Sequence, residues 1–240
     1  ITRHDYDEEN RPQDYLPMSH GERVTRLLTR WGTPYAYGFI ESMVADRGYG
    51  EGSFTEMELS DPTIQMLDEI RNQATRNTHD ILNVAEKIEM VEVSRQPEEN
   101  RSGIVIGAAN IRSARYPNGV PTVVIAMEAS EKLASLTEVI CSRIIAAINY
   151  ARKNNMPITW MAVSAGAHTD MQTGAENLEW TSLVLGQLNQ FAQQGGVVNV
   201  YASSNTLIGA QSYWIAIADF LERTKGMLIM GPHSALMLTG

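Results

Sequence analysis

Apolar positions recur with two different periods along the second half of the chain. Short β-branched runs predict strands, and longer stretches with apolar residues three or four positions apart predict helices. The expected strands are residues 103–109, 122–127, 158–163, 197–202, 227–230 and 235–238, and the expected helices are residues 136–153, 175–194 and a third from about Gly209. Regular strand–helix–strand alternation predicts parallel strands joined by crossover helices, and therefore an α/β fold.

Polar residues and glycines mark the ends of these elements. Ser135 and Glu138 have the spacing of a capping box, and "SLTE" therefore predicts a helix start. The "RYPNG" segment predicts a turn between the first two strands. The inward faces of the two long helices are expected to carry Leu136, Ile140, Ile144, Ile148 and Ala151 in the first and Leu178, Leu185, Leu188 and Phe191 in the second.

The first hundred residues have a different organisation. Residues 1–30 form a polar N-terminal arm that ends in a short helix around Val24–Trp31, and residues 31–100 form a separate segment. Within it Asp61 is the expected N-cap of a helix with Ile64, Leu67 and Ile70 inward. Residues 94–102 predict a solvated loop and a boundary, so residues 101–240 form the core. The chain begins with Ile1, and we expect a fragment or a processed product.

Composition and charge exclude several classes of protein. The net charge of −9 disfavours general binding to nucleic acid or to an anionic membrane. The single cysteine, Cys141, excludes an internal disulfide and is expected to be a small core residue. The sequence contains neither a run of eighteen apolar residues nor a signal-peptide pattern, so a cytoplasmic protein is expected.

Motifs of metal and nucleotide chemistry are missing from the sequence. The five histidines have no metal-ligand spacing, so no metal site is expected, and neither a Walker motif nor a GxSxG elbow occurs. Glu176, Glu179 and Asp170 are first interpreted as favourable charges or caps at a helix N-terminus, and only second as general acids or bases.

Two strand-to-helix junctions instead carry runs of small residues, "SAGA" after Val163 and "IGA" at 208–210. In a parallel sheet such junctions follow the carboxyl ends of neighbouring strands, where ligands bind. Small residues expose backbone N–H groups, and two that converge form an oxyanion hole. Glycines that serve only tight turns remain the alternative.

The residues around these junctions resemble a known family. "AVSAGAHTDM" is similar to the oxyanion loop of the crotonase superfamily, and "LIGAQSYWIAIADFLERTKGMLIMGPHSALMLTG" to a segment of biotin-dependent carboxyltransferases. Upstream, "RWGTPYAYGFIESM", "FTEMELSD", "ARYPNGVPTVVIAME" and "INYARKNNMPITWMAVSAGA" resemble successive segments of the carboxyltransferase domain of multidomain acetyl-CoA and acyl-CoA carboxylases, in the same order. The similarity covers roughly residues 30–240 and corresponds to the N-terminal half of that domain.

The resemblance implies a crotonase-like (ClpP/crotonase) ββα spiral and transfer of a carboxyl group from carboxybiotin to the α-carbon of an acyl-CoA such as acetyl- or propionyl-CoA. It implies that the backbone N–H groups of Gly166 or Ala167 and of Gly209 or Ala210, with Ile208 beside them, face the thioester oxygen. The implied partners are a C-terminal crotonase-like half, biotin carboxyl carrier and biotin carboxylase domains, and a second copy in at least a dimer.

Two departures from the family pattern keep alternatives open. His168 stands where the related loop has arginine, so its part in substrate binding is in doubt, and the sequence ends at Gly240 before any second half. A crotonase-type acyl-CoA decarboxylase and an inactive crotonase-like scaffold are the alternatives. A hydratase is disfavoured because the helix that starts at Gly209 opens with Gln211, Ser212 and Tyr213 where a hydratase needs carboxylates.

Overall fold

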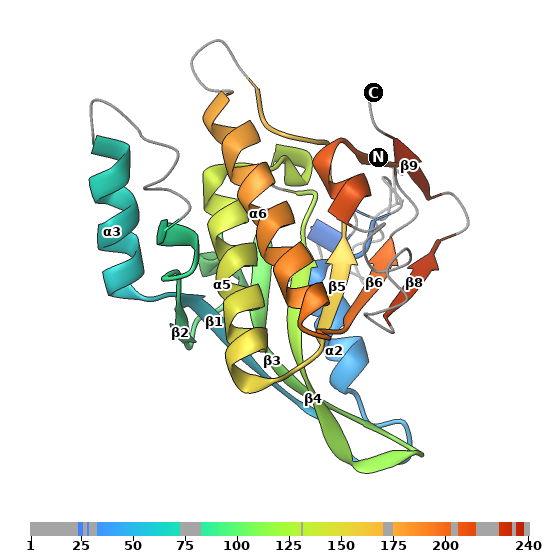
Figure 1. The fold of residues 1–240 in the computed structure, drawn as a ribbon. Coiled ribbons are helices and arrows are strands. Elements are labelled where there is room, and N and C mark those ends of the chain that lie inside the picture. The colour runs from blue at the N-terminus through green and yellow to red at the C-terminus, as the bar shows by residue number, and fades with distance from the viewer. Residues whose placement is uncertain are drawn as a thin grey trace, which may run out of the picture.

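Helices pack against both faces of a seven-stranded mixed sheet (Figure 1). The computed structural model describes residues 24, 25, 28, 33–72, 83–130, 132–169, 175–202, 206–214, 226–231 and 234–237. The sheet has the order β2-β1-β3-β4-β5-β6-β8, and β7 and β9 form a separate parallel pair. The strands are β1 Ser53–Leu59, β2 Met90–Glu92, β3 Ile104–Ser113, β4 Tyr116–Met127, β5 Ile158–Ala162, β6 Val198–Ala202, β7 Thr206–Ile208, β8 Met227–Met230 and β9 Ala235–Met237. The helices are α2 Ala36–Val44, α3 Asp61–Asn72, α5 Glu138–Asn154 and α6 Ala175–Gln193, with 3-10 turns at Pro97–Glu99 and Lys132–Ala134.

The carboxyl-terminal half of the sheet is parallel, as the alternation of elements predicted. Ile125 of β4 pairs with Trp160 of β5, which pairs with Val200 of β6, which pairs with Leu228 of β8. The helices α5 and α6 connect β4 to β5 and β5 to β6. The parallel register brings the carboxyl ends of these strands to one edge, where ligands bind in such sheets.

The other half of the sheet is antiparallel, and this half was only partly predicted. β3 pairs with β4 on one side and with β1 on the other, and β1 pairs with β2. The "RYPNG" segment lies within β4 from Tyr116 onwards and is not a turn, because β3 and β4 continue as a long hairpin that turns at residues 114–115. Strands on either side of residue 100 therefore belong to one sheet.

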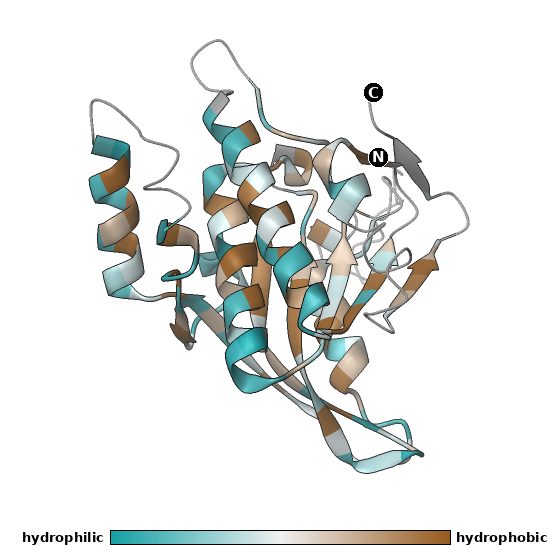
Figure 2. Cartoon of the chain, viewed as in Figure 1, coloured by the Kyte–Doolittle hydropathy of each residue, from teal (hydrophilic) through white to brown (hydrophobic). Residues whose placement is uncertain are grey.

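Alternation along the central strands builds two apolar layers. Ile106, Ile125 and Trp160 face the side that α5 and α6 cover, whereas Val124 and Met161 pack with α2 on the opposite face. The central strands are among the most hydrophobic ribbons of the molecule, and α5 and α6 alternate between hydrophobic and hydrophilic residues (Figure 2). The Cys141 thiol is buried on the α5 side, as predicted, and burial raises its pKa.

The predicted cap of α5 was wrong by two residues. Thr137 is the N-cap, and its hydroxyl accepts a hydrogen bond from Ile140 N at 3.4 Å. Leu136 is not helical because it forms a β-bridge with Ala167 instead. The predicted end of the helix is confirmed, since Asn155 caps it in the left-handed conformation with φ 53°.

Two inward-facing assignments were also wrong. Ile64 is 40% exposed and Thr63 lies inward in its place. α3 begins at Asp61, one residue earlier than predicted, and Ser60 Oγ rather than the expected N-cap Asp61 accepts from Thr63 N. Leu178 of α6 is 54% exposed, whereas Leu188 and Phe191 are buried as expected.

The segment 94–102 is less solvated than predicted. Arg95 Nε donates to Glu56 Oε1 at 2.8 Å and Arg95 Nη1 to Glu58 Oε2 at 3.1 Å, which ties the segment to β1. Asn100 Nδ2 also donates to Glu56 Oε1 at 3.1 Å. The ion pairs explain why a polar sequence is anchored here.

Two expectations meet the structure only in part. Residues 24, 25 and 28 are helical, and Val24 and Leu28 are buried, but the rest of the expected N-terminal arm lies outside the described residues. Across the described ranges, no helix is both long and apolar enough to cross a membrane.

Candidate functional site

The two small-residue junctions meet in space. Gly166 follows β5 with φ 94°, and Gly209 follows β7 with φ 68°, both in the region that favours glycine. A Cβ placed on Gly209 would lie 3.7 Å from Gly166 Cα, and one placed on Gly166 would lie 3.5 Å from Ile208 Cγ2. A side chain on either glycine would therefore contact the other loop, although the two loops are about forty residues apart in sequence.

Ser164 holds the two junctions together. Its carbonyl oxygen accepts a hydrogen bond from Ile208 N at 3.2 Å, and its hydroxyl accepts one from Gly166 N at 3.0 Å. The side chain is only 3% exposed. Sequence reasoning treated Ser164 as the end of a strand and missed this bridging role.

The segment that follows β4 braces the first junction from the other side. Leu136 N donates to Gly166 O at 2.8 Å, and His168 N donates to Leu136 O at 2.9 Å. Ala165 N donates to Leu133 O at 3.2 Å, and Leu133 has φ 55°. No sequence pattern predicted these contacts, because they depend on a single β-bridge between Leu136 and Ala167, which are distant in sequence.

These contacts use some of the backbone N–H groups at the junctions and leave others without an acceptor. Within the described residues, the turn hydrogen bonds use the N–H groups of Gly166, His168 and Ile208, and none uses that of Ala167. Since Ile208 N faces Ser164, the N–H of Gly209 faces β9 on the other side of β7. Because neighbouring N–H groups alternate in direction along the bridged segment, the N–H of Ala167 points away from Leu136. Unsatisfied donors at one point are what an anionic oxygen requires.

A helix that begins at the second junction adds further donors. Residues 210–214 are helical, so the N–H of Ala210 is among those without an intrahelical acceptor. Ser212 Oγ donates to Gly209 O at 2.6 Å and fixes the turn. Trp214 is buried against Trp160 with ring centroids 5.9 Å apart, which anchors the helix to β5.

His168 is held through its backbone. Asn177 Nδ2 donates to His168 O at 2.8 Å, and Asn177 Oδ1 accepts from Glu138 N at 3.1 Å. Asn177 is 7% exposed and thereby links the starts of α5 and α6 to the junction loop, a role that the sequence did not reveal. Glu176 lies in the first turn of α6, as expected, and Asp170 lies outside the described residues.

A polar cavity of about 500 Å³ opens at the same edge of the sheet, beside the carboxyl end of β4. Burial, and next the carboxylate of Glu128, raises the pKa of Tyr35 in this cavity to about 12. Glu98 and Glu128 line it beside Arg101, so the cavity does not favour a phosphate.

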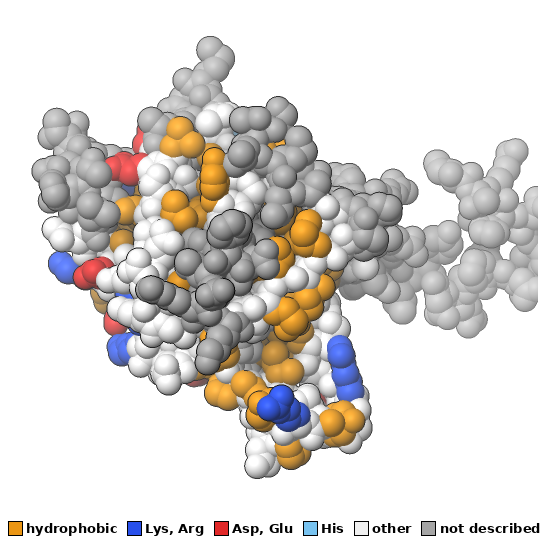
Figure 3. All heavy atoms as spheres, turned by 45° about the vertical axis from the view of Figure 1, so that its right-hand side comes forward, with side chains coloured by type: hydrophobic (Ala, Val, Ile, Leu, Met, Phe, Trp, Pro, Cys, Tyr) orange, Lys and Arg blue, Asp and Glu red, His pale blue; other side chains and the backbone are white. Residues whose placement is uncertain are grey.

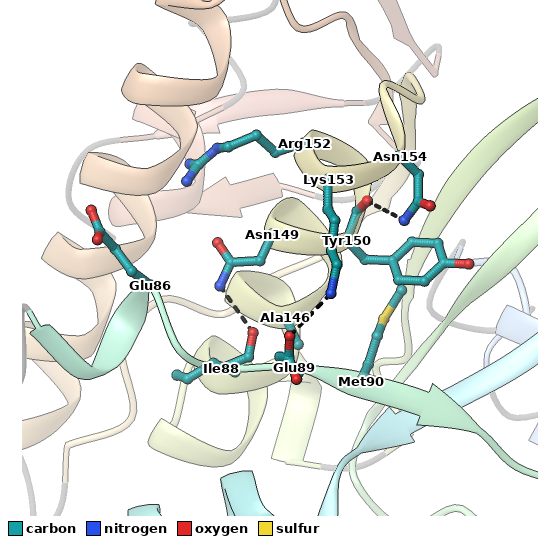
Figure 4. Close-up of a pocket in the computed structure, with 10 residues that line it drawn as sticks. All are labelled: Glu86, Ile88, Glu89, Met90, Ala146, Asn149, Tyr150, Arg152, Lys153 and Asn154. Carbon is teal, nitrogen blue, oxygen red and sulfur yellow. Dashed lines mark hydrogen bonds and ion pairs between the residues drawn. The ribbon is translucent and has the colours of Figure 1, made fainter.

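A second cavity, of about 380 Å³, lies away from the junctions, between α5 and the segment 86–90 (Figure 4). Asn149 Nδ2 donates there to Ala85 O at 2.8 Å and to Ile88 O at 2.9 Å. Arg152 Nη2 donates to Gln187 Oε1 at 2.9 Å, and burial lowers the pKa of Arg152. These side chains fasten neighbouring elements to α5, and the cavity carries no arrangement typical of catalysis.

Metal chemistry finds no support in the described ranges, which hold no group of three or more His, Cys, Asp or Glu side chains placed to bind an ion. The prediction of no metal site comes from the spacing of the histidines in the sequence, and it is tested by elemental analysis of protein purified without an affinity tag, which should show no stoichiometric zinc or iron. One tightly held ion per chain would contradict this prediction and would return His168 and His233 as candidate ligands.

No protein-family model matches the chain, but curated relatives do, among them two subunits from one organism. The chain is 28% identical over 141 residues to acetyl-coenzyme A carboxylase carboxyl transferase subunit beta 2 of Lachnospira eligens, covering 59% of this chain and 52% of the relative. It is 25% identical over 139 residues to subunit beta 1 of the same organism, covering 58% and 51%. The chain thus spans about half the length of these relatives.

The fold resembles the crystal structure of the transcarboxylase 12S hexamer, which has hydrolysed methylmalonyl-coenzyme A bound, with a TM-score of 0.57 at 15% identity. The match covers 92% of this chain and 34% of that one, and at this identity it speaks for the fold alone. The chain is therefore similar in sequence to acetyl-coenzyme A carboxylase carboxyl transferase subunits and similar in fold to a transcarboxylase.

Proposed function

We propose that the chain is the acyl-CoA-binding half of a biotin-dependent carboxyltransferase. The observation that carries this proposal is the contact between the Gly166 and Gly209 turns, with the N–H group of Ala167 unused by the turn hydrogen bonds and that of Ala210 without an intrahelical acceptor. A thioester oxygen at this point would accept both donors, and the Gly209 turn would fix the position of the second. The bonds strengthen as the oxygen becomes an enolate, so they favour the reaction and not merely binding.

The contribution of this chain is then electrostatic. Among the described junction residues, His168 is the one with a titratable side chain, and the proposal assigns it, with Ile208, to substrate binding. When present, carboxybiotin supplies the carboxyl group. The backbone donors are fixed by Ser164 and by the brace at Leu136, so they need little reorganisation when charge develops.

The proposal extends to partners. Carboxybiotin becomes a negatively charged urea as its carboxyl group leaves, and that charge requires donors of its own. The described residues provide one set of converging donors, which we assign to the thioester. We therefore propose that a C-terminal crotonase-like half binds the biotin, which a carrier domain delivers, in an assembly of at least two copies.

An acyl-CoA decarboxylase remains the second candidate because it needs the same oxyanion hole. A hydratase is disfavoured: Gln211 is buried, and Tyr213 is 55% exposed at the start of the helix where carboxylates are required. Incubation with malonyl-CoA in the absence of biotin separates the candidates, since carbon dioxide release at an enzymatic rate would identify a decarboxylase. An inactive scaffold would bind no acyl-CoA.

Calorimetry tests the thioester pocket directly. We expect a non-hydrolysable acetyl-CoA analogue that retains the carbonyl to bind about thirtyfold more tightly than free CoA, since each of two hydrogen bonds contributes about 1 kcal/mol. Propionyl-CoA analogues would then define the acyl pocket. Equal affinity for CoA and for the acyl analogue would contradict the assignment of the Ala167 and Ala210 donors.

A further inference from the structure

A large groove lies at the opposite end of the parallel strands from the junctions. Its volume is about 690 Å³, and residues at the beginning of β5 and β6 form its floor, whereas the junctions follow the ends of these strands. One wall is the tip of the β3–β4 hairpin, and the other is α2 with the loop after it. The apolar lining includes Phe39, Met43, Tyr116, Val120, Tyr201 and Met227. We call it the strand-start groove.

Several large apolar side chains of the strand-start groove are exposed to solvent. Tyr49, Tyr116 and Met227 are 45%, 47% and 51% exposed. Figure 3 shows hydrophobic side chains gathered on this side of the molecule, from the sheet to the hairpin. Phe39 packs edge-on against Tyr201 with ring centroids 5.6 Å apart, which gives the floor a fixed shape. Contiguous exposed apolar surface of this kind marks an interaction site.

The charge of the groove is opposite to that of the whole chain. The charged residues that line it are Arg47 and Arg112, although the chain has 28 acidic and 19 basic residues. Asp46 lies at the same rim and offsets part of the charge of Arg112, and its carboxylate also accepts hydrogen bonds from the N–H groups of Gly48, Tyr49 and Gly50 at 2.7–3.0 Å. Figure 3 shows Lys and Arg side chains beside the hydrophobic ones at the hairpin. The groove therefore suits an acidic segment with aromatic or aliphatic anchors.

We propose that the strand-start groove binds the acidic N-terminal arm of this chain, residues 4–16, "HDYDEENRPQDYL". These residues lie outside the described ranges and contain the complementary chemistry. The acidic residues are Asp5, Asp7, Glu8, Glu9 and Asp14, against Arg11 alone among Lys and Arg, and the apolar anchors are Tyr6, Tyr15 and Leu16. Charges of opposite sign steer such a segment to the groove, and the apolar anchors hold it there.

Tethering strengthens this contact. Extended chain spans about 3.3 Å per residue, so the link between Leu16 and the first described residue, Val24, reaches roughly 25 Å. A segment on a short link experiences a local concentration in the millimolar range. If the link spans the distance from Val24 to the groove, an interaction too weak for a free peptide is sufficient for the arm. The docked arm would cover the apolar groove without contributing to the junctions.

Hydrogen exchange with the full 240-residue chain tests the proposal. We expect the hairpin tip, 111–120, and the loop 42–50 to exchange at least threefold faster when the five acidic residues of the arm are replaced by Asn and Gln. Arg47→Glu with Arg112→Glu should have the same effect. The matched control Arg101→Glu, an exposed arginine outside the groove, should leave the exchange of both segments unchanged.

A charge swap makes the test specific. Combining Arg47→Glu and Arg112→Glu with lysine at the five acidic arm positions should restore slow exchange, which a merely destabilised hairpin would not show. Unchanged exchange in the neutralised arm, or failure of the swap to rescue, would overturn the proposal. Protection that rises with protein concentration, together with a dimer in light scattering, would overturn it in favour of a second copy.

Discussion

Replacing Gly209 with valine should lower the rate of the proposed carboxyl transfer by about a hundred- to a thousand-fold, the usual effect of losing one oxyanion donor. The reason is conformational. Gly209 has φ 68°, a region that β-branched residues avoid, so a valine would rotate the backbone and redirect the N–H groups of Gly209 and Ala210. A Cβ at this position would lie 3.7 Å from Gly166 Cα, an ordinary contact, so the loss comes from rotation and not from a clash.

Stability should fall only modestly in the same variant. Left-handed geometry costs a non-glycine residue about 1–2 kcal/mol, which lowers Tm by roughly 2–8 °C in a chain of this size. Gly48→Val is a matched control, since Gly48 has φ 91° and an added Cβ there would meet nothing within 4 Å. It should show a similar change in Tm and unchanged kcat. A Gly209→Val enzyme that keeps most of its kcat in the complete assembly would refute the two-junction site.

The parallel half of the fold could be predicted from the sequence because its strands are buried on both faces. Ile158–Ala162 is buried at every position, so a continuous apolar run is its signature. β1 has the opposite character: Glu56 and Glu58 alternate with Met57 and Leu59, and their charges are hidden by Arg95 rather than by water. A strand whose polar side is neutralised by ion pairs does not stand out by hydropathy alone.

The glycines of the candidate site could be predicted from the sequence. The hydrogen bonds that decide which backbone N–H groups stay free could not. The runs "SAGA" and "IGA" identified two positions with positive φ, and the structure brings Gly166 and Gly209 together. The choice between neighbouring donors depends on one serine hydroxyl, since Ser164 Oγ occupies the N–H of Gly166 and leaves that of Ala167. The Leu136–Ala167 bridge and the Asn177 link join residues distant in sequence, and no local pattern encodes them.

The isolated chain should transfer no measurable carboxyl group from carboxybiotin to acetyl- or propionyl-CoA, although it should bind the acyl-CoA. Carboxyl transfer develops negative charge on two groups, the thioester oxygen and the biotin urea, and each needs preorganised donors. Across the described ranges, the turns at Gly166 and Gly209 are in contact and so form one set. One set of donors cannot stabilise both charges, because the thioester oxygen and the biotin urea lie on opposite sides of the carboxyl group that moves between them.

The apolar end of β8 is the place where we expect the proposed C-terminal half to dock. Ile229 and Met230 are both 42% exposed at the end of β8 that lies at the same edge as the junctions. Apolar side chains at the edge of a sheet are typical of a surface that binds a partner.

Carboxylation should therefore be assayed with the isolated 240 residues and again after a C-terminal crotonase-like half is added, with light scattering in parallel. We expect activity and a larger particle only in the mixture, and Ile229→Lys should prevent both while leaving acyl-CoA binding intact. A soluble monomer that carboxylates acyl-CoA at ordinary enzymatic rates would show that this chain holds both sets of donors itself.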